Sequence, residues 1–182
     1  PYRPEPAVLA QRLAALEGVL DWAAVQQAAA PWETLHLKHV TSSAGTVFQP
    51  QPDGSILSTG DPPEREVITL TGETQRGAVT AVRLEALTHQ SLPQGGPGRA
   101  PNGNFALGNI AVTCSPVDAA ADATPLQVRL TAARATHQQD AGELSAAASI
   151  DDREVSGWAV DAGGIGRDQA AVFDFEQPVS IA

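Results

Sequence analysis

The chain has 182 residues, a length typical of one domain, and 42% of them are hydrophobic, which suffices for a core. Its formal net charge of −10 argues against nucleic acid and anionic membranes as partners, because both attract clustered lysine and arginine. No apolar run approaches the roughly 18 residues of a membrane-spanning helix, so no membrane insertion is expected. The 16 glycines and 14 prolines predict a chain rich in turns.

The N-terminal segment, residues 1–31, is predicted to be helical over residues 7–30. Leucines recur at helical spacing and form a narrow apolar seam at Leu9, Leu13, Leu16 and Leu20. Pro31 ends the pattern, because proline disfavours the helical conformation of the residue before it. The helix packs either on its own domain or against a helix of another chain, and in both cases we expect the seam to be covered.

Residues 32–182 change from helical to two-residue periodicity. Val82, Leu84 and Ala86 alternate with more polar positions, which is typical of antiparallel strands with one buried face. Turn signals such as Pro52-Asp-Gly54 and Gly163-Gly164 separate such stretches. Strands are expected at 34–40, 66–71, 79–87, 105–113, 126–132, 144–150, 158–161 and 170–175. The pattern predicts a mostly β fold, an antiparallel β-sandwich of jelly-roll type with one N-terminal α-helix.

Residues 91–105 form the most unusual stretch, with four glycines, three prolines and two asparagines around Arg99. A guanidinium can donate five hydrogen bonds, and a proline- and glycine-rich loop leaves many carbonyls unpaired. We therefore expect Arg99 to bond loop carbonyls or a carboxylate. Three interpretations stay open for the loop: a rigid corner held by Arg99, a ligand-binding loop, or a disordered segment.

This loop resembles a motif of large planctomycete-type secreted proteins. The residues that carry the resemblance are Val82-Arg-Leu-Glu-Ala-Leu87, Ser91-Leu-Pro93 and Gly95-Gly-Pro-Gly-Arg-Ala-Pro-Asn-Gly-Asn-Phe-Ala-Leu107. Those proteins combine cytochrome c-like domains with domains of unknown function, and the motif lies in a module similar to galactose-binding-like and carbohydrate-binding sandwiches. The resemblance implies an extracytoplasmic (periplasmic or cell-surface) location. No Cys-x-x-Cys-His occurs here, so covalent haem attachment does not carry over.

Four residues are candidate ligand contacts if the module binds sugar. Trp158 follows a glycine and could stack on a sugar ring, while Arg99, Asn102 and Asn104 could bond its hydroxyls. For Trp158 the competing interpretation is core packing. An exposed Trp158 would favour sugar binding, and a buried one would favour an assembly role.

Catalytic and metal-binding signatures are lacking in the sequence. There is no Gly-x-Ser-x-Gly nucleophile motif and no calcium-loop spacing, and the two rings of His36-Leu-Lys-His39 fall on opposite faces of a strand. We therefore predict no enzymatic activity, no catalytic residues and no metal site among the residues singled out. A structural Ca²⁺ is the one cofactor that the resemblance allows.

The sequence supports two functions of different classes. The first is a non-catalytic carbohydrate-binding-like module of a larger extracytoplasmic protein, with a polysaccharide as partner. The alternative is a structural or assembly module that docks neighbouring domains or subunits and binds no sugar.

The C-terminal pattern predicts an incomplete sandwich. Residues 170–175 read as a strand, Gln177-Pro178 breaks it, and Val179-Ser-Ile181 begins another. By resemblance the module continues for one or two strands, so residues 32–182 are expected to lack the last of them. Either another polypeptide supplies the missing strand through edge pairing, or residues 179–181 lie at an edge that something outside this sequence protects.

Overall fold

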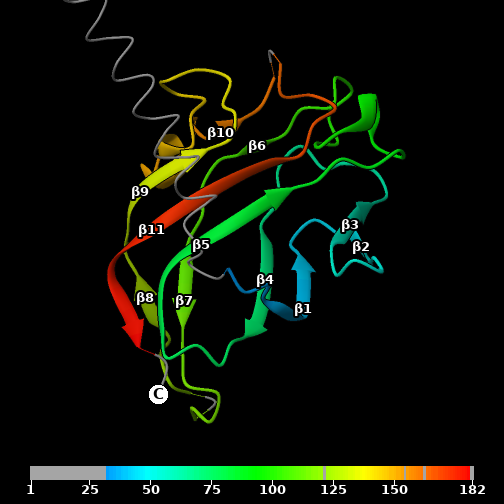
Figure 1. Ribbon diagram of the computed structural model, residues 1–182. Helices are drawn as coiled ribbons and strands as arrows, with labels where there is room; N and C mark the ends of the chain where they lie inside the picture. Colours follow the sequence, from blue (N-terminus) through cyan, green and yellow to red (C-terminus); the bar gives the residue numbers. More distant parts are fainter. Residues whose placement is uncertain (1–31, 121, 154, 162, 181–182) are drawn as a thin grey trace, which may run out of the picture. The chain divides into compact units, whose positions relative to one another are not determined.

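The computed structural model describes residues 32–120, 122–153, 155–161 and 163–180 (Figure 1). The chain divides into two units, Pro1–Thr34 and Leu35–Ala182. The predicted helix over residues 7–30 and its leucine seam lie outside the described residues. In the second unit the described chain is mostly β, and every pair of strands is antiparallel.

Among the described residues of this unit, short strands and two 3-10 turns make up the regular structure. The elements, in chain order, are β1 (His36–Ser42), β2 (Val47–Pro50), β3 (Ile56–Thr59), β4 (Ile68–Glu73), β5 (Ala78–Ala86), η1 (Pro93–Gly95), β6 (Ala106–Leu107), β7 (Val112–Cys114), β8 (Leu126–Val128), β9 (Leu130–Ala135), η2 (Ala147–Ile150), β10 (Trp158–Ala159) and β11 (Gln169–Ser180). β11 is the middle strand of a three-stranded sheet, ordered β5-β11-β9 (Figure 1). Four two-stranded sheets pair β1 with β4, β2 with β3, β6 with β10 and β7 with β8.

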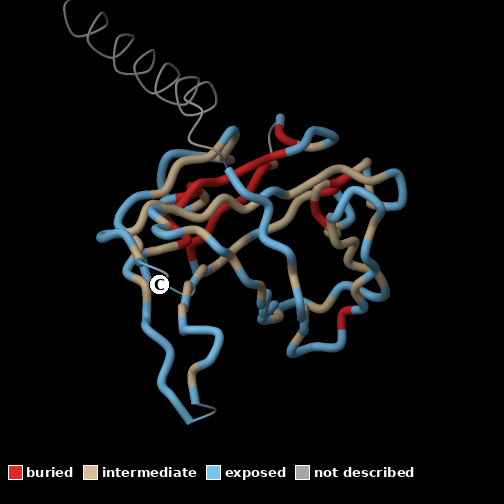
Figure 2. Tube along the Cα trace, turned by 60° about the horizontal axis from the view of Figure 1, so that its bottom comes forward, coloured by how far each residue is buried: buried red, intermediate tan, exposed pale blue. Residues whose placement is uncertain are grey.

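The core lies against one face of the three-stranded sheet. Ala171 and Phe173 on β11 are two residues apart and so point to the same face, where both are fully buried. Their partners across the sheet are Leu84 and Val82 on β5, which pack against this core. Trp158, Val160 and Ala146 complete the buried cluster. Figure 2 shows the buried chain gathered around these elements, whereas long stretches elsewhere are exposed.

Residues 144–150, expected as a strand, are instead a turn followed by η2. The Ser145 hydroxyl donates to the Gly142 carbonyl (2.7 Å) and accepts from the Ala148 N–H (3.3 Å). The Ser149 hydroxyl donates to the Ala146 carbonyl (2.7 Å). Such local bonds from serine to nearby backbone offer the chain an alternative to a sheet ladder. The alternation of Leu144, Ala146 and Ala148 therefore did not produce a strand.

The break predicted at Gln177-Pro178 is also wrong. β11 runs through it to Ser180, and Val179 and Ser180 pair with Val79 and Ala78 of β5. The proline falls within the register shift between Asp174 and Val179, where its missing N–H costs no ladder bond. The segment is thus a continuation of β11 that pairs with β5 alone.

The β2–β3 hairpin was not among the expected strands, although its turn was. Gly54 has a φ of +87° in the Pro52-Asp-Gly54 turn, and the Asp53 carboxylate accepts from the Ser55 N–H (2.9 Å) and hydroxyl (2.7 Å). These bonds hold the pKa of Asp53 below its usual value. The turn fixes the hairpin, and both strands are too short for alternation to reveal them.

Candidate functional sites

Arg99 ties the 91–105 loop to the β2–β3 hairpin. Its guanidinium donates to the Thr46 hydroxyl (3.0 Å) and to the carbonyls of Thr59 (3.3 Å) and Gly60 (2.7 Å). Glu66 lies 3.8 Å away, and both charged side chains are 16% exposed. The expected carbonyl and carboxylate partners are present, but the carbonyls belong to the end of β3 and not to the loop itself.

The two asparagines also bond within the protein. The Asn102 side-chain amide donates to the Asp161 carboxylate (3.0 Å), and its Oδ1 accepts from the Asn104 N–H (3.2 Å). The Asn104 side-chain oxygen accepts from the Val160 N–H (3.0 Å). Gly98 has to be a glycine, because a Cβ there would lie 1.9 Å from the Asn104 carbonyl oxygen. The loop is a corner whose polar side chains bond neighbouring segments.

Trp158 lies in the core. Its side chain is 0% exposed, its ring meets Phe105 edge-on at 5.0 Å between centroids, and its Nε1–H donates to the His137 carbonyl (2.8 Å). A ring in this position presents no face to a ligand. The other three candidates, Arg99, Asn102 and Asn104, come from one loop. Trp158 is buried and forms no surface with them.

The β1–β4 sheet has one apolar face. Cross-strand partners place Val40 opposite Leu70 and Leu37 opposite Gly72, and Ile68 lies two residues before Leu70. We call Leu35, Leu37, Val40, Ile68 and Leu70 the apolar face. Leu35 belongs to it because its side chain fills the space over Gly72, where a Cβ would lie 2.6 Å from Leu35 Cγ.

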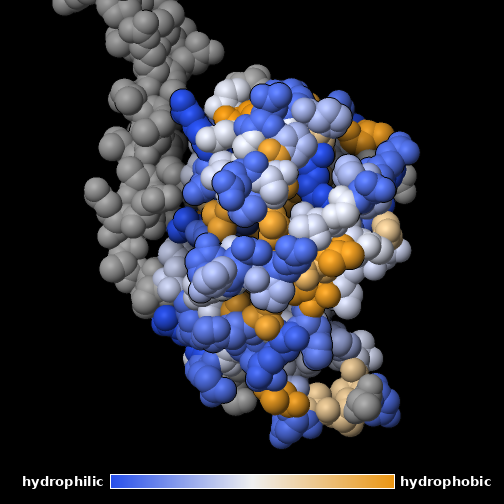
Figure 3. All heavy atoms as spheres, turned by 90° about the vertical axis from the view of Figure 1, so that its right-hand side faces the viewer, coloured by the Kyte–Doolittle hydropathy of each residue, from blue (hydrophilic) through white to orange (hydrophobic). Residues whose placement is uncertain are grey.

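This apolar face is poorly covered. Leu35, Ile68 and Leu70 are 42%, 44% and 46% exposed. The opposite face of the sheet carries Thr69 and Thr71 on β4. Figure 3 views the side on which Figure 1 places β1, β2 and β3, and apolar surface interrupts the polar surface there. Sequence reasoning missed this face, although the alternation in residues 66–71 was the available signal.

A hollow of about 540 Å³ lies between the start of the 91–105 loop and the segment before β11. Its lining residues are Thr88, His89, Gln90, Gln94, Gly95 and Gly166. Beside it, the Asp168 carboxylate accepts from the Thr88 N–H and hydroxyl, both at 2.7 Å. Those two bonds lower the pKa of Asp168. No motif in the sequence marks this hollow, because its two sides are about 70 residues apart along the chain.

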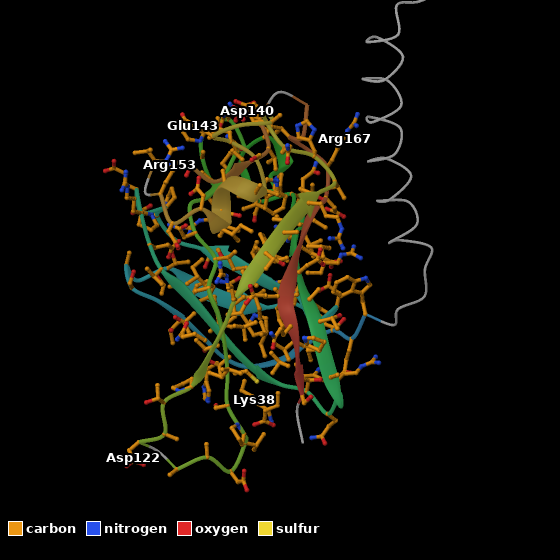
Figure 4. The ribbon with its side chains drawn as sticks, turned by 90° about the vertical axis from the view of Figure 1, so that its left-hand side faces the viewer. Lys38, Asp122, Asp140, Glu143, Arg153 and Arg167 are labelled. Carbon is orange, nitrogen blue, oxygen red and sulfur yellow. The ribbon has the colours of Figure 1, made fainter. Side chains whose placement is uncertain are left out.

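A second hollow of about 360 Å³ adjoins charged groups that already have partners. Glu143 and Arg153 form an ion pair at 3.0 Å, and Figure 4 shows them near Asp140. The Asp140 carboxylate accepts from the Gly142 (2.7 Å) and Leu144 (3.0 Å) N–H groups. The Asp151 carboxylate accepts from the Arg153 N–H and the Ser156 hydroxyl, and the first of these bonds is the main reason for its lowered pKa.

Within the described part of the chain, no group of three or more His, Cys, Asp or Glu side chains could hold a metal ion. No helix of those residues is long and apolar enough to cross a membrane. Comparison of the chain with protein-family models, with curated proteins and with solved structures finds no match.

Proposed function

We propose that this chain is a non-catalytic assembly module of a larger extracytoplasmic protein, and that it docks a neighbouring polypeptide on the apolar face. The observation that carries the proposal is the exposure of Leu35, Ile68 and Leu70 on one face of a two-stranded sheet. Covering the exposed part of each of these three side chains would stabilise a complex by roughly 1 kcal/mol per side chain. A sheet face of this kind is normally covered in a stable assembly.

The occupant that fits best is an extended segment with apolar side chains at alternate positions. Successive side chains of an extended chain point to opposite sides, so a segment lying over the apolar face would turn every second side chain toward it. An acidic segment is disfavoured by the net charge of −10, so the partner segment is neutral or basic.

The buried Trp158 supports this choice over sugar binding, since stacking on an aromatic ring was the expected sugar contact. A jelly-roll sandwich of galactose-binding type remains our proposal for how the antiparallel sheets are arranged. Carbohydrate binding is a second candidate function, and the uncharged hollow beside the 91–105 loop is the observation that favours it.

The docking function is tested by photo-cross-linking of the whole protein in its own cells. A photoreactive amino acid at position 70 should capture one discrete polypeptide, and the same group at position 71, on the opposite face, should not. The captured partner, once purified, should bind Ile68→Asp at least tenfold more weakly than wild type, and should bind the control Thr69→Asp normally.

Three results would overturn the docking proposal. They are an absence of adducts at position 70, equal adducts at positions 70 and 71, and an adduct confined to this same chain.

A further inference from the structure

The hollow beside the 91–105 loop has a rigid floor. The His89 N–H donates to the Gly95 carbonyl (3.1 Å), and the Leu92 N–H donates to the His89 carbonyl (2.9 Å). The Gly95 N–H donates to the Leu92 carbonyl (3.0 Å), and the Gly166 N–H donates to the Gly96 carbonyl (2.7 Å). The last bond joins the two sides of the hollow. A site held in this way is formed before any ligand arrives, which lowers the cost of binding.

Three side chains in the hollow have hydrogen-bonding groups to offer. The amides of Gln90 and Gln94 make no hydrogen bond with other described residues, and both residues are exposed. His89 Nδ1 lies 2.7 Å from the Ser91 hydroxyl oxygen and accepts from the Ser91 N–H (3.2 Å), which leaves Nε2 as the ring nitrogen without a bond to other described residues. The hollow thus presents two amide groups and one imidazole nitrogen.

Gln94 occupies its place at a local conformational cost. Its φ of +55° lies in the left-handed region, and among the described residues only Asp152 shares that property without being glycine. Glycine adopts this conformation freely, whereas a residue with a Cβ adopts it at a steric cost. Residues strained in this way concentrate at ligand-binding positions.

The chemistry of the lining selects the ligand class. None of the six lining residues is an acid, a lysine or an arginine. The next two residues along the chain, Arg167 and Asp168, carry one charge of each sign. Amide groups both donate and accept, which matches a hydroxyl group that does the same. An anion or a cation would find no countercharge in the lining.

We infer that the hollow lined by Thr88, His89, Gln90, Gln94, Gly95 and Gly166 binds an uncharged polyhydroxy compound, namely a neutral sugar unit. The inference rests on the second candidate function and places it away from Trp158. Its volume, about 540 Å³, is within the range of small-molecule sites. Because no Phe, Tyr or Trp ring lines the hollow, we expect binding of a single sugar unit to be weak.

The test is NMR titration of the ¹⁵N-labelled chain with methyl glucoside, methyl galactoside and methyl mannoside, and with phosphate and acetate as charged probes. At least one glycoside should cause saturable shifts of the Gly95 and Gly166 amides and of the side-chain amides of Gln90 and Gln94. Phosphate and acetate should leave those signals unchanged.

Two variants separate the site from the fold. Gln94→Gly removes both the side chain and the strain, so it should weaken glycoside binding at least tenfold and raise the melting temperature. The matched control Gln127→Ala, at an exposed position of β8, should bind as wild type does.

The outcomes distinguish the site from the function. Saturable glycoside shifts on other residues would overturn this site and leave carbohydrate binding standing. Absence of saturable shifts with every glycoside would overturn both. Shifts at the hollow with phosphate or acetate alone, or unchanged glycoside binding by Gln94→Gly, would also overturn the inference.

Discussion

Replacing Arg99 with alanine should destabilise the protein by about 2–3 kcal/mol. The change leaves the Thr46 hydroxyl, the Thr59 and Gly60 carbonyls and the Glu66 carboxylate without the guanidinium. A hydrogen bond from a charged donor contributes about 1.5–3 kcal/mol, and a buried acceptor left unpaired costs about 1–3 kcal/mol. Water reaches part of this site and replaces some of the lost bonds, so the three bonds should not contribute their full sum.

Equilibrium urea unfolding, followed by circular dichroism and tryptophan fluorescence, measures this change in the free energy of unfolding. Arg99→Lys keeps the charge but lacks the planar fork that serves acceptors on two sides, so it should recover less than half of the loss. Arg153→Ala is the control. The Arg153 side chain, which pairs with Glu143, is 54% exposed, so its removal should change the free energy of unfolding by less than about 0.5 kcal/mol.

A double-mutant cycle isolates the ion pair between Arg99 and Glu66. At 3.8 Å the pair is long, and the Ser42 hydroxyl already donates to the Glu66 carboxylate at 2.6 Å. The coupling with Glu66→Gln should therefore be at most about 1 kcal/mol. If Arg99→Ala unfolds within about 0.5 kcal/mol of wild type, the loop is not held by this residue and the reasoning fails.

Three further predictions concern stability. Trp158→Phe removes the indole hydrogen bond to the His137 carbonyl and leaves a void, so the free energy of unfolding in urea should fall by about 2 kcal/mol. The control Trp32→Phe, at an exposed position, should change it very little, and equal effects of the two variants would contradict the core placement of Trp158. Gly72→Ala forces a Cβ into Leu35 and should lower the melting temperature, and an unchanged value would show that Leu35 does not occupy that space. Asp168 has a lowered pKa because of its bonds from Thr88, so its contribution to stability is present above the unfolded-state pKa of about 4 and is lost as the pH falls through the lower folded-state value. Asp168→Asn should therefore show a flatter acid-unfolding profile below about pH 4, and a profile that parallels wild type would exclude this linkage.

Periodicity located several strands, but the single strands expected at 105–113 and 126–132 are each two strands that belong to different sheets. Alternation in residues 79–87 predicted β5, because a strand with one face on the core repeats apolar residues at every second position. Residues 170–175 predicted β11 as a short apolar run, and positions 169–173 are buried without alternation. Alternation also appears in residues 144–150, yet the serine hydroxyls there bond the nearby backbone and the segment turns. A local pattern does not report which hydrogen-bond partner a backbone group will find.

Side-chain chemistry at the 91–105 loop was predictable in kind but not in partner. The composition of the loop predicted loop carbonyls or a carboxylate as partners of Arg99, and the guanidinium instead bonds carbonyls outside the loop, with the Glu66 carboxylate 3.8 Å away. Those carbonyls lie about 40 residues earlier in the chain, and no local signal connects the two segments. Long-range pairing of this kind depends on how the hairpin packs, which is a property of the whole fold.

The chain by itself determined a mostly antiparallel β protein, because alternation and turn chemistry act over a few residues. It left the 91–105 loop open between a rigid corner, a ligand-binding loop and a disordered segment. Only the tertiary structure decided that Trp158 is a core residue, since a Gly-Trp-Ala-Val stretch suits a buried strand and an exposed one equally well. It also decided that Leu35, Ile68 and Leu70 share an exposed face, and that residues 88–95 meet Gly166 around a hollow. Burial and proximity follow from contacts between segments far apart in the chain, and a single sequence read locally does not contain those contacts.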